Sequence, residues 1–433
     1  MKLVIVGFGP AGFAAALYAR KQNPDAEICV IDEKDYLAHS CYLPFALDGT
    51  IKLEDTKHDP MLGKMRIEHI TFARVTKIDK ENKKVELTKD GGTKSVSYDK
   101  LLISTGSKAF KPRIEGIENA FGLYSFQDAE AVSKKIKEFE SAVVIGAGAI
   151  GIETAFALKK AGLKVTIAEA FGSVMQQSFD NELSSLLEDE IRKNGIDLLL
   201  NSKVQKIVGK KIILENSEIE TDMVVLAVGV RPNIELAQDV VEIENGNISV
   251  NELMQTSDPD IYAAGDCCHA FNFITKKPCN AKLSTIAYLQ GMVAGVNAVG
   301  GNRKYIGTLG TFVSRIDRYE VASTGITEGE AKKLGMEIIT SKINAFAIPE
   351  PFPENNKIML KLVAEKGSGR ILGAQGYGFG ATNRINLIAQ AIYSNAKLTD
   401  MLDYENAYCP SVSKTYDLLK VGVEMAIRKN TRL

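Results

Sequence analysis

A strand–turn–helix–strand module occurs twice in this chain of 433 residues, and the repeat restricts the fold more than any other feature. Residues 2–33 read KLVIVGFGPAGFAAALYARKQNPDAEICVIDE, and residues 141–170 read SAVVIGAGAIGIETAFALKKAGLKVTIAEA. In each copy a β-branched run precedes G-x-G-x-x-G, helical sequence follows, and a second strand ends in an acid. The glycines and acids are Gly7, Gly9, Gly12 and Asp32 in the first copy and Gly146, Gly148, Gly151 and Glu169 in the second. This repeat predicts an α/β chain with two Rossmann-like dinucleotide-binding domains.

Each glycine of this spacing has a separate physical task. The first makes the tight turn, the second lets the backbone approach a pyrophosphate, and the third lets helix and strand pack closely. The helix N-terminus offers free N–H groups and a partial positive charge to the phosphates. The acid accepts hydrogen bonds from a ribose hydroxyl.

Two dinucleotide sites on one chain suggest one resident cofactor and one that exchanges, with hydride passing between them. The carboxylate of Glu169 pairs with a ribose 2′-OH and repels a 2′-phosphate, which favours NADH. NADPH stays open as an alternative, because neighbouring basic side chains can still admit the phosphate.

Composition excludes several other classes of protein. Lys and Arg number 53 and Asp and Glu 54, so no net charge favours nucleic acid or an anionic membrane. The six cysteines are scattered and form no metal-binding pattern with the four histidines, which favours a reducing cytoplasm. The glycine turn interrupts the apolar N-terminus, so we do not expect a signal peptide, and no apolar run is long enough to span a membrane.

Over its whole length the chain resembles the flavin-dependent pyridine nucleotide-disulfide oxidoreductases. GFGPAG with Asp32 is similar to the family's FAD turn, and GAGAIGIE with Glu169 to its NAD turn. The segments LLISTGS, AVGVRPN and TSDPDIYAAGDC follow in the family's order, and ASTGITEGEAKKLG and ENAYCPSVS resemble its C-terminal dimerisation domain. The resemblance implies FAD and NADH as cofactors, and it extends the cofactor-binding residues to Pro10, Ala11, Glu33, Thr105, Gly106, Ile150, Gly229, Gly265 and Asp266.

Cys41 is the candidate redox centre. It lies in CYLPF, and no second cysteine follows at the C-x-x-x-x-C spacing of glutathione reductase-like members. CYLPF fits the C-x-x-P-[YF] hallmark of the single-cysteine branch, which contains CoA-disulfide reductases, NADH oxidases and peroxidases, and persulfide or polysulfide reductases. A single cysteine can cycle between a thiolate and a mixed disulfide, persulfide or sulfenic acid. A buried structural cysteine is the alternative.

Three positions bear on the branch. Pro10 stands where the peroxidases and oxidases of this type carry a histidine, which argues against a dedicated enzyme of that kind. The tyrosine pair of CoA-disulfide reductases is absent from PEPFPENN, at Pro351 and Phe352, so Tyr408 remains the candidate catalytic tyrosine from a second subunit. Arg20 and Lys21 could meet an adenosine phosphate of CoA, although exposed helical cations are usually only solvated.

Three other features leave alternatives open. Cys409 could pair with Cys41 across a dimer, but a small residue filling a small hole is the simpler interpretation. Adjacent Cys267 and Cys268 are interpreted as packing. His39 lies two residues from Cys41 and could lower its pKa, although a surface histidine is the simpler account.

The predicted architecture has an FAD-binding domain at 1–112 and 245–310, an NAD-binding domain at 113–244 and an α+β dimerisation domain at 311–433. A hairpin should turn at 367–369, and a helix should follow over 385–397. The resemblance implies a homodimeric NAD(P)H oxidoreductase that reduces a small-molecule disulfide, persulfide or polysulfide through Cys41. The alternatives are an NADH oxidase, an electron-transfer flavoprotein that passes electrons to O₂, a quinone or an iron–sulfur partner, and a non-enzymatic redox sensor.

Overall fold

The structure is a computed structural model that describes residues 1–352 and 357–431. Residues 353–356, which end the PEPFPENN stretch, lie outside this description. The described chain forms two compact units, one of residues 1–110, 123–130 and 229–308 and one of residues 111–122, 131–228 and 309–431. The domain boundaries at 112, 244 and 310 remain predictions.

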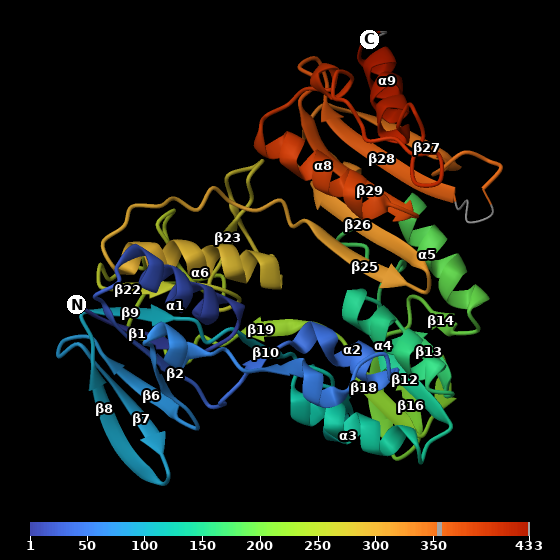
Figure 1. The fold of residues 1–433 in the computed structure, drawn as a ribbon. Coiled ribbons are helices and arrows are strands. Elements are labelled where there is room, and N and C mark those ends of the chain that lie inside the picture. The colour runs from blue at the N-terminus through green and yellow to red at the C-terminus, as the bar shows by residue number, and fades with distance from the viewer. Residues whose placement is uncertain (353–356, 432–433) are drawn as a thin grey trace. The chain divides into compact units, whose positions relative to one another are not determined.

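The first unit is built on a five-stranded parallel sheet with the order β22-β9-β1-β2-β5 (Figure 1). The central strands β1 and β2 have the buried, β-branched sequence typical of parallel sheets covered on both faces. The strands are β22 (Ile261–Ala263), β9 (Lys100–Ile103), β1 (Lys2–Val6), β2 (Glu27–Ile31) and β5 (Glu68–Ile70). Strand β22 thus joins strands more than 150 residues earlier in the chain, as a domain interrupted by an insertion requires.

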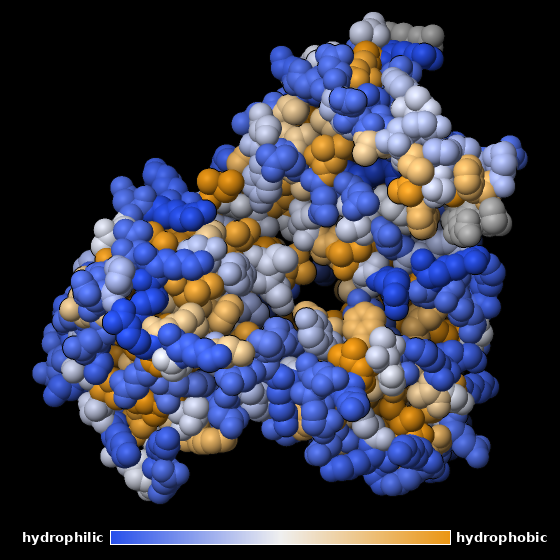
Figure 2. All heavy atoms as spheres, viewed as in Figure 1, coloured by the Kyte–Doolittle hydropathy of each residue, from blue (hydrophilic) through white to orange (hydrophobic). Residues whose placement is uncertain are grey.

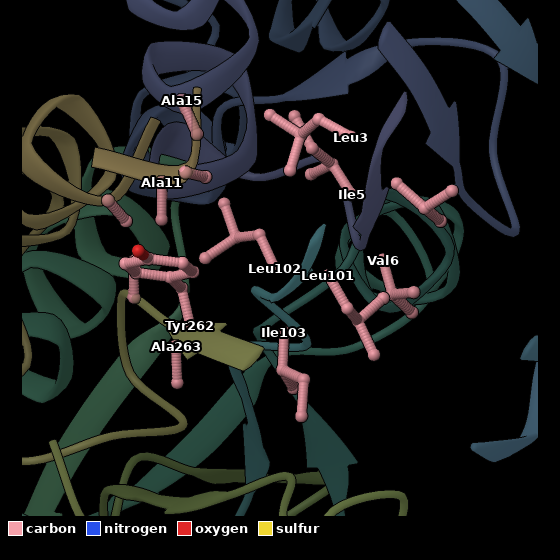
Figure 3. Packing of buried hydrophobic residues seen from close by; sticks show 14 of the residues in the cluster. Leu3, Ile5, Val6, Ala11, Ala15, Leu101, Leu102, Ile103, Tyr262 and Ala263 are labelled. Carbon is pink, nitrogen blue, oxygen red and sulfur yellow. The ribbon is translucent and has the colours of Figure 1, made fainter. Parts of the chain in front are cut away.

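Helices α1 (Pro10–Gln22) and α6 (Ser284–Ala298) lie side by side in this unit (Figure 1). Their close approach depends on glycine, because a Cβ at Gly291 would lie 2.1 Å from the Ala11 carbonyl oxygen and one at Gly295 2.3 Å from that of Ala15. Figure 3 shows Ala11 and Ala15 beside the core formed by sheet residues such as Leu102. The alanine-rich sequence of α1 therefore serves helix packing as well as helix propensity.

The remaining elements of the first unit are an antiparallel meander and short pieces that frame the site. The meander consists of β6 (Arg74–Asp79), β7 (Lys84–Lys89) and β8 (Gly92–Ser97). The short pieces are β3 (Leu37–Ala38), η1 (Ser40–Tyr42), α2 (Leu43–Leu47), η2 (Leu53–Thr56), β4 (Lys57–His58), η3 (Leu62–Met65), β10 (Ser107–Ala109), β19 (Val230–Pro232), β20 (Ile243–Glu244), β21 (Asn247–Ile248), β23 (Ala270–Phe271) and β24 (Pro278–Cys279).

The second unit contains a second parallel sheet with the order β11-β18-β12-β13-β14 and a C-terminal antiparallel sheet. The parallel part comprises η4 (Ile117–Asn119), β11 (Phe121–Gly122), β12 (Ser141–Ile145), α4 (Ala149–Lys160), β13 (Lys164–Ala168), α5 (Asn181–Lys193), β14 (Asp197–Leu199) and β18 (Met223–Leu226), with a meander of β15 (Val204–Val208), β16 (Lys211–Leu214) and β17 (Glu218–Glu220). Helix α3 (Phe126–Ile136) has residues in both units.

The C-terminal sheet has the order β25-β26-β29-β28-β27. Helix α7 lies between its strands in the sequence, and α8 and α9 follow the last strand. Its elements are β25 (Phe312–Ile316), β26 (Tyr319–Gly325), α7 (Glu328–Lys333), β27 (Ile338–Phe346), β28 (Lys357–Glu365), β29 (Ile371–Gly378), α8 (Ala381–Tyr393), η5 (Thr399–Met401) and α9 (Leu418–Thr431). The predicted hairpin between β28 and β29 is confirmed, with Gly367 and Gly369 at φ +82° and +69°.

The helix predicted over 385–397 is displaced, since α8 spans Ala381–Tyr393. Its apolar periodicity was correctly identified, but the ends depend on backbone conformations that periodicity does not reveal. Gly380 precedes the helix at φ +69°, and Asn395 follows it at φ +53°. Left-handed residues such as these commonly end helices, so the last predicted turn belongs to the following loop.

A buried cation connects strand β28 of the C-terminal sheet to helices α5 and α7 of the second unit. Lys361 on β28 is 2% exposed, and its Nζ lies 3.0 Å from carboxylate oxygens of Asp180 and Glu182 and 2.7 Å from one of Glu328. Asp180 also accepts hydrogen bonds from the main-chain N–H groups of Glu328 and Gly329, at the start of α7. Removal of these carboxylates would leave the Lys361 charge buried without partners, which is strongly destabilising.

No helix among the described residues combines the length and the apolar character that crossing a membrane requires. On the face shown in Figure 2, hydrophilic residues cover most of the surface of each unit.

Candidate active site

The first glycine turn joins β1 to α1 and leaves space where a phosphate could lie. A Cβ at Gly7, which has φ +95°, would lie 2.4 Å from the Ser104 carbonyl oxygen, and one at Gly12 would lie 2.1 Å from that of Gly7. At Gly9, in contrast, a Cβ would meet nothing within 4 Å. The first and third glycines are therefore required by packing within the protein, whereas the second leaves an open cradle.

The start of α1 is suited to an anion. Gly9 is its N-cap, Pro10 is its first residue, and no side chain caps it. The first N–H groups of a helix have no partner inside the helix and carry a partial positive charge. Pro10 loses no helical bond, because its position needs no N–H. With Ala11 and Gly12 in the first turn, this cradle fits the pyrophosphate of FAD.

The acid of the first module is oriented by the same turn. Asp32 Oδ2 accepts a hydrogen bond of 2.6 Å from Phe8 N, and Oδ1 accepts one of 2.8 Å from Lys34 N. The carboxylate is therefore fixed beside the glycine turn and keeps lone pairs for a ribose hydroxyl. Glu33 instead lies 3.6 Å from Arg74 Nε, and both side chains are exposed. Of these two predicted residues, only Asp32 contacts the turn.

The second glycine turn, between β12 and α4, repeats this geometry in the second unit. A Cβ at Gly146, which has φ +104°, would lie 2.6 Å from the Ala227 carbonyl oxygen, and one at Gly151 would lie 2.0 Å from that of Gly146. Gly148 again has nothing within 4 Å of its Cβ position, and no side chain caps α4. Ile150 in the first helical turn is 38% exposed. This turn is the candidate cradle for NADH.

Glu169 is held in the same way as Asp32. Its Oε2 accepts a 2.6 Å bond from Ala147 N and its Oε1 a 2.9 Å bond from Phe171 N, and the residue is only 8% exposed. A carboxylate fixed at this position has lone pairs for a 2′-OH and repels a 2′-phosphate. The geometry therefore agrees with a preference for NADH.

Glu169→Arg is expected to lower the ratio of kcat/KM for NADH to that for NADPH by about tenfold or more, because the ribose acceptor is lost and a cation appears. Steady-state kinetics with both nucleotides and one acceptor measure this ratio. Asp189→Asn, which removes an exposed acid on α5, serves as the control and should leave the ratio unchanged. An unchanged ratio in Glu169→Arg would exclude Glu169 from the ribose site.

The segments that return to the first unit converge on Asp266. Ser107 Oγ donates a 2.7 Å hydrogen bond to Asp266 Oδ2, and Tyr124 OH lies 2.9 Å from Ser107 Oγ. Burial raises the pKa of Tyr124, so its hydroxyl keeps its proton at neutral pH. Lys282 Nζ lies 2.7 Å from the Asp266 carbonyl oxygen, to which it donates. Separate groups thus hold the main chain and the side chain of Asp266, the residue predicted to bind FAD.

The other predicted residues of this region shape the main chain. Thr105 Oγ1 donates to the Asn233 carbonyl oxygen over 2.7 Å, and Gly106 has φ +68°. Gly229 accepts a hydrogen bond from Phe110 N. Gly265 N donates to Gln290 Oε1, at 2.9 Å, which links the segment to α6. These residues position the loop around Asp266.

Cys41 lies in η1, directly before α2, and is exposed. Its Sγ is 3.6 Å from Ser284 Oγ, and Ser284 is the first residue of α6. The thiol therefore faces the N-terminal end of the fifteen-residue helix α6, which carries a partial positive charge. The alternative of a buried structural cysteine is wrong for Cys41.

The other cysteines differ from Cys41 in their surroundings. Burial and Glu68 raise the pKa of Cys29 to about 12, so its thiol stays protonated. Cys267 and Cys268 are buried, and their thiols lie 3.4 and 3.3 Å from the carbonyl oxygens of Ala264 and Gly265, to which they donate. Cys409 is exposed, and a hydrogen bond with Ser411 lowers its pKa. Cys41 and Cys409 are thus the two exposed thiols.

Two further sequence predictions can be compared with the geometry. The Arg20 guanidinium donates to four carbonyl oxygens, those of Pro24, Ala26, Met65 and Arg66, so it is committed to the protein itself. Lys21 lies over the Tyr18 ring. Arg20 therefore gives no support to a CoA phosphate site on α1.

Tyr408, the predicted catalytic tyrosine, belongs to the second unit and is 54% exposed. Its catalytic role remains a prediction. Sequence reasoning missed Ser284, Tyr124, Lys282 and Gln290, because each reaches the site from a distant part of the chain. Ser107 was inside the LLISTGS segment and could have been singled out as the hydroxyl beside Thr105 and Gly106.

Comparison with known proteins identifies the family. The model of the pyridine nucleotide-disulphide oxidoreductases matches residues 1–291, and that of their dimerisation domain matches residues 315–418. An NADH oxidase of Methanocaldococcus jannaschii is 34% identical over 99% of both chains. An NAD(P)H coenzyme A polysulfide/persulfide reductase of Pyrococcus horikoshii is 32% identical over 97% of both.

A solved NAD-dependent persulfide reductase from A. fulgidus has a TM-score of 0.96 and 33% identity, covering 100% of this chain and 84% of its own. The matches extend over both glycine turns, the Cys41 segment and the C-terminal sheet. The chain therefore belongs to the pyridine nucleotide-disulphide oxidoreductases, the FAD-dependent family of oxidoreductases that its two glycine turns and its order of segments predicted.

Proposed function

We propose that this protein uses NADH to reduce a small disulfide, persulfide or polysulfide through Cys41. The observation that carries the proposal is the environment of this thiol, which is exposed, faces the start of α6 and has Ser284 Oγ 3.6 Å away. A buried thiol such as Cys29 could not meet a substrate. The names of the persulfide reductases from P. horikoshii and A. fulgidus support this class of substrate.

The reaction on Cys41 is thiol–disulfide exchange. The thiolate attacks one sulfur of R–S–S–R′, the new Sγ–S bond forms, the old S–S bond breaks, and R′S⁻ leaves and takes a proton. Two electrons from NADH then reduce the mixed disulfide, so that RS⁻ leaves and the Cys41 thiolate returns. The sum is NADH, a proton and R–S–S–R′ giving NAD⁺, RSH and R′SH. FAD, when bound, supplies the transfer of these two electrons.

The chain's own residues have distinct tasks in this scheme. The Ser284 hydroxyl and the first turn of α6 stabilise negative charge on Sγ. The Gly7–Gly12 turn and Asp32 bind the diphosphate and ribose of FAD, and Ser107 and Lys282 hold Asp266 for its ribityl part. The Gly146–Gly151 turn and Glu169 bind NADH.

A steady-state screen with NADH tests the proposal. It compares cystine-type disulfides, CoA disulfide, a persulfide, polysulfide, peroxide, O₂ and a quinone, with thiol or hydrosulfide release measured beside NADH loss. Turnover of a disulfide or persulfide that releases two thiol equivalents per NADH is expected. Turnover with O₂ or quinone alone would overturn the proposal.

NADH oxidation by O₂ is the second candidate, and the M. jannaschii relative's name favours it. Pro10 counts against it, because the first glycine turn then has no histidine beside the thiol. An oxygen electrode separates the candidates, since an oxidase consumes O₂ in proportion to NADH even without a sulfur acceptor.

We also propose that the working unit is a homodimer whose site takes Tyr408 from the partner subunit. The dimerisation-domain match supports the dimer. Tyr408 (54%), Val412 (64%) and Tyr416 (44%) are large side chains that a single chain leaves exposed, which supports a surface that the second subunit covers. In a two-fold dimer such a segment can complete the partner's site.

Mixed dimers test this shared site. Chains with Cys41→Ser and with Tyr408→Phe are co-expressed with different tags, and the heterodimer is purified. One site then carries both changes and the other carries neither, so about half of the wild-type activity per dimer is expected. Activity equal to the average of the two mutant homodimers would show instead that each site is built from one chain.

A further inference from the structure

Two histidines, His39 and His58, lie close to each other where the chain enters the helical turn that carries Cys41. Strands β3 and β4 pair antiparallel, with Leu37 opposite His58, and His39 N donates to the Thr56 carbonyl oxygen. This pairing brings the rings of His39 and His58 to a centroid distance of 6.0 Å. Among the described residues, no hydrogen bond reaches either imidazole.

The ring of His39 is held in place by Tyr42. The two rings are stacked, with centroids 4.8 Å apart and planes 15° apart. Tyr42 directly follows Cys41 and is 44% exposed. His39 and Tyr42 thus flank the thiol in the sequence, and their stack fixes one imidazole next to the short helix that carries it.

The histidine pair is separate from the nearest lysine. In the two-stranded pairing Lys57 is opposite Ala38, on the other face from Leu37 and His58. Lys57 Nζ lies 3.3 Å from the Phe126 ring centroid and 5.2 Å from that of Tyr36, so its charge is engaged there. The imidazoles of His39 and His58 are candidate donors on the other face of the pairing from Lys57.

Burial and His58, and no carboxylate, account for the shifted pKa of His39, and Glu54 in η2 is exposed. Asp59, which follows His58, directs Oδ1 to Met61 N, Asp48 after α2 directs Oδ1 to Thr50 N, and Asp55 in η2 directs Oδ2 to Lys52 N. Burial and the neighbouring His58 both lower the pKa of His39. His58 thus opposes a proton on His39, and an anion beside the two rings would remove that opposition.

A metal ion does not explain the arrangement, because the described residues contain no group of three or more metal-binding side chains. We propose that His39 and His58 bind the negative charge of the substrate that Cys41 attacks, so that the site selects an anionic disulfide, persulfide or polysulfide over a neutral one. This rests on the proposed function. The charge can lie on a terminal sulfur or on a carboxylate or phosphate of the substrate.

Alkylation of Cys41 by two reagents tests the charge preference without turnover. Iodoacetate and iodoacetamide share the same leaving group and differ in charge, so the ratio of their rates cancels the ionisation of the thiol. Rates at Cys41 are followed by peptide mass spectrometry on reduced, desalted holoenzyme. An unstructured peptide with a single cysteine, added to the same reaction, is the reference.

The iodoacetate/iodoacetamide ratio at Cys41 should exceed that of the reference peptide and rise about threefold or more as the pH falls from 7 to 5, because the pKa of His39 is lowered and its imidazole gains positive charge only below the usual range. In His39→Phe/His58→Gln the rise should disappear, while phenylalanine preserves a ring for Tyr42 to stack on. His58→Lys should restore a high ratio that no longer changes with pH. Lys64→Gln, which removes an exposed cation elsewhere in the unit, should behave as wild type.

Steady-state kinetics then identify the source of the charge. The histidine variants should raise KM for dithiodipropionate if a carboxylate is bound, and for polysulfide if charged sulfur is bound, while KM for neutral hydroxyethyl disulfide stays constant. Equal ratios at Cys41 and in the reference peptide at every pH, or a pH-dependent rise that survives in the double variant, would overturn the inference. A wild type that reduces none of these sulfur compounds would refute the proposed function instead, whatever the alkylation ratios.

Discussion

Cys41→Ser is expected to lower kcat for disulfide or persulfide reduction on the order of 10³-fold or more, because a serine hydroxyl cannot form the mixed disulfide. Hydride transfer from NADH should stay near the wild-type rate, since the NADH cradle at Gly146–Gly151 and Glu169 belongs to the other unit of the chain. Anaerobic stopped-flow absorbance after one equivalent of NADH measures this first half-reaction, and thiol release measures the second.

Cys409→Ser provides the matched thiol variant, since Cys409 is also exposed and also lies next to serine hydroxyls. It should retain disulfide turnover. A loss comparable to that of Cys41→Ser would mean that a second thiol takes part, as in a bridge between subunits. Disulfide turnover at the wild-type rate in Cys41→Ser would refute the role of Cys41.

Gly12→Ala and Gly9→Ala are both expected to weaken FAD binding, but for different reasons. At Gly12 the new methyl group would lie 2.1 Å from the Gly7 carbonyl oxygen, so α1 must move away from the turn. This should destabilise even the FAD-free protein by about 1–3 kcal/mol, the usual cost of overpacking. At Gly9 nothing lies within 4 Å, so the FAD-free protein should keep its stability and lose only affinity for the pyrophosphate.

Urea unfolding of the FAD-free proteins and FAD titration separate these effects. Gly9→Ala should unfold as wild type and bind FAD about tenfold or more weakly, because the second glycine allows the backbone to approach the pyrophosphate. Gly63→Ala, outside the turn, with no atom near its Cβ position and without a left-handed backbone, controls for replacing a glycine as such. Normal FAD affinity in Gly9→Ala would show that the pyrophosphate lies elsewhere.

Both dinucleotide modules could be predicted from sequence because their geometry is local. The third glycine of each turn lies five residues from the first, and their contact is steric, so spacing alone carries the information. The acid at the end of the second strand is also set by local chain length. The predicted hairpin at 367–369 depends on nearby glycines in the same way.

The surroundings of Cys41 could not be predicted, since they come from residues far apart in the chain. Ser284 is 243 positions from Cys41, and nothing in its own sequence marks it as a neighbour of a thiol. His58 reaches His39 only because two-residue strands pair. The sequence places Arg20 on a helix but does not show its partners. Its four carbonyl partners come from loops that reach it only in the folded chain.

The most direct test of the account is to trap the bond that Cys41 should form. Holoenzyme is reduced with one equivalent of NADH without oxygen, mixed with one equivalent of a disulfide, and quenched with acid after part of a single turnover. Peptide mass spectrometry should find the substrate's thiol attached to Cys41 and to no other cysteine, in an amount that rises and then falls as thiol is released. Complete reduction of the disulfide in that turnover, with the Cys41 peptide unmodified at every time point, would contradict the account.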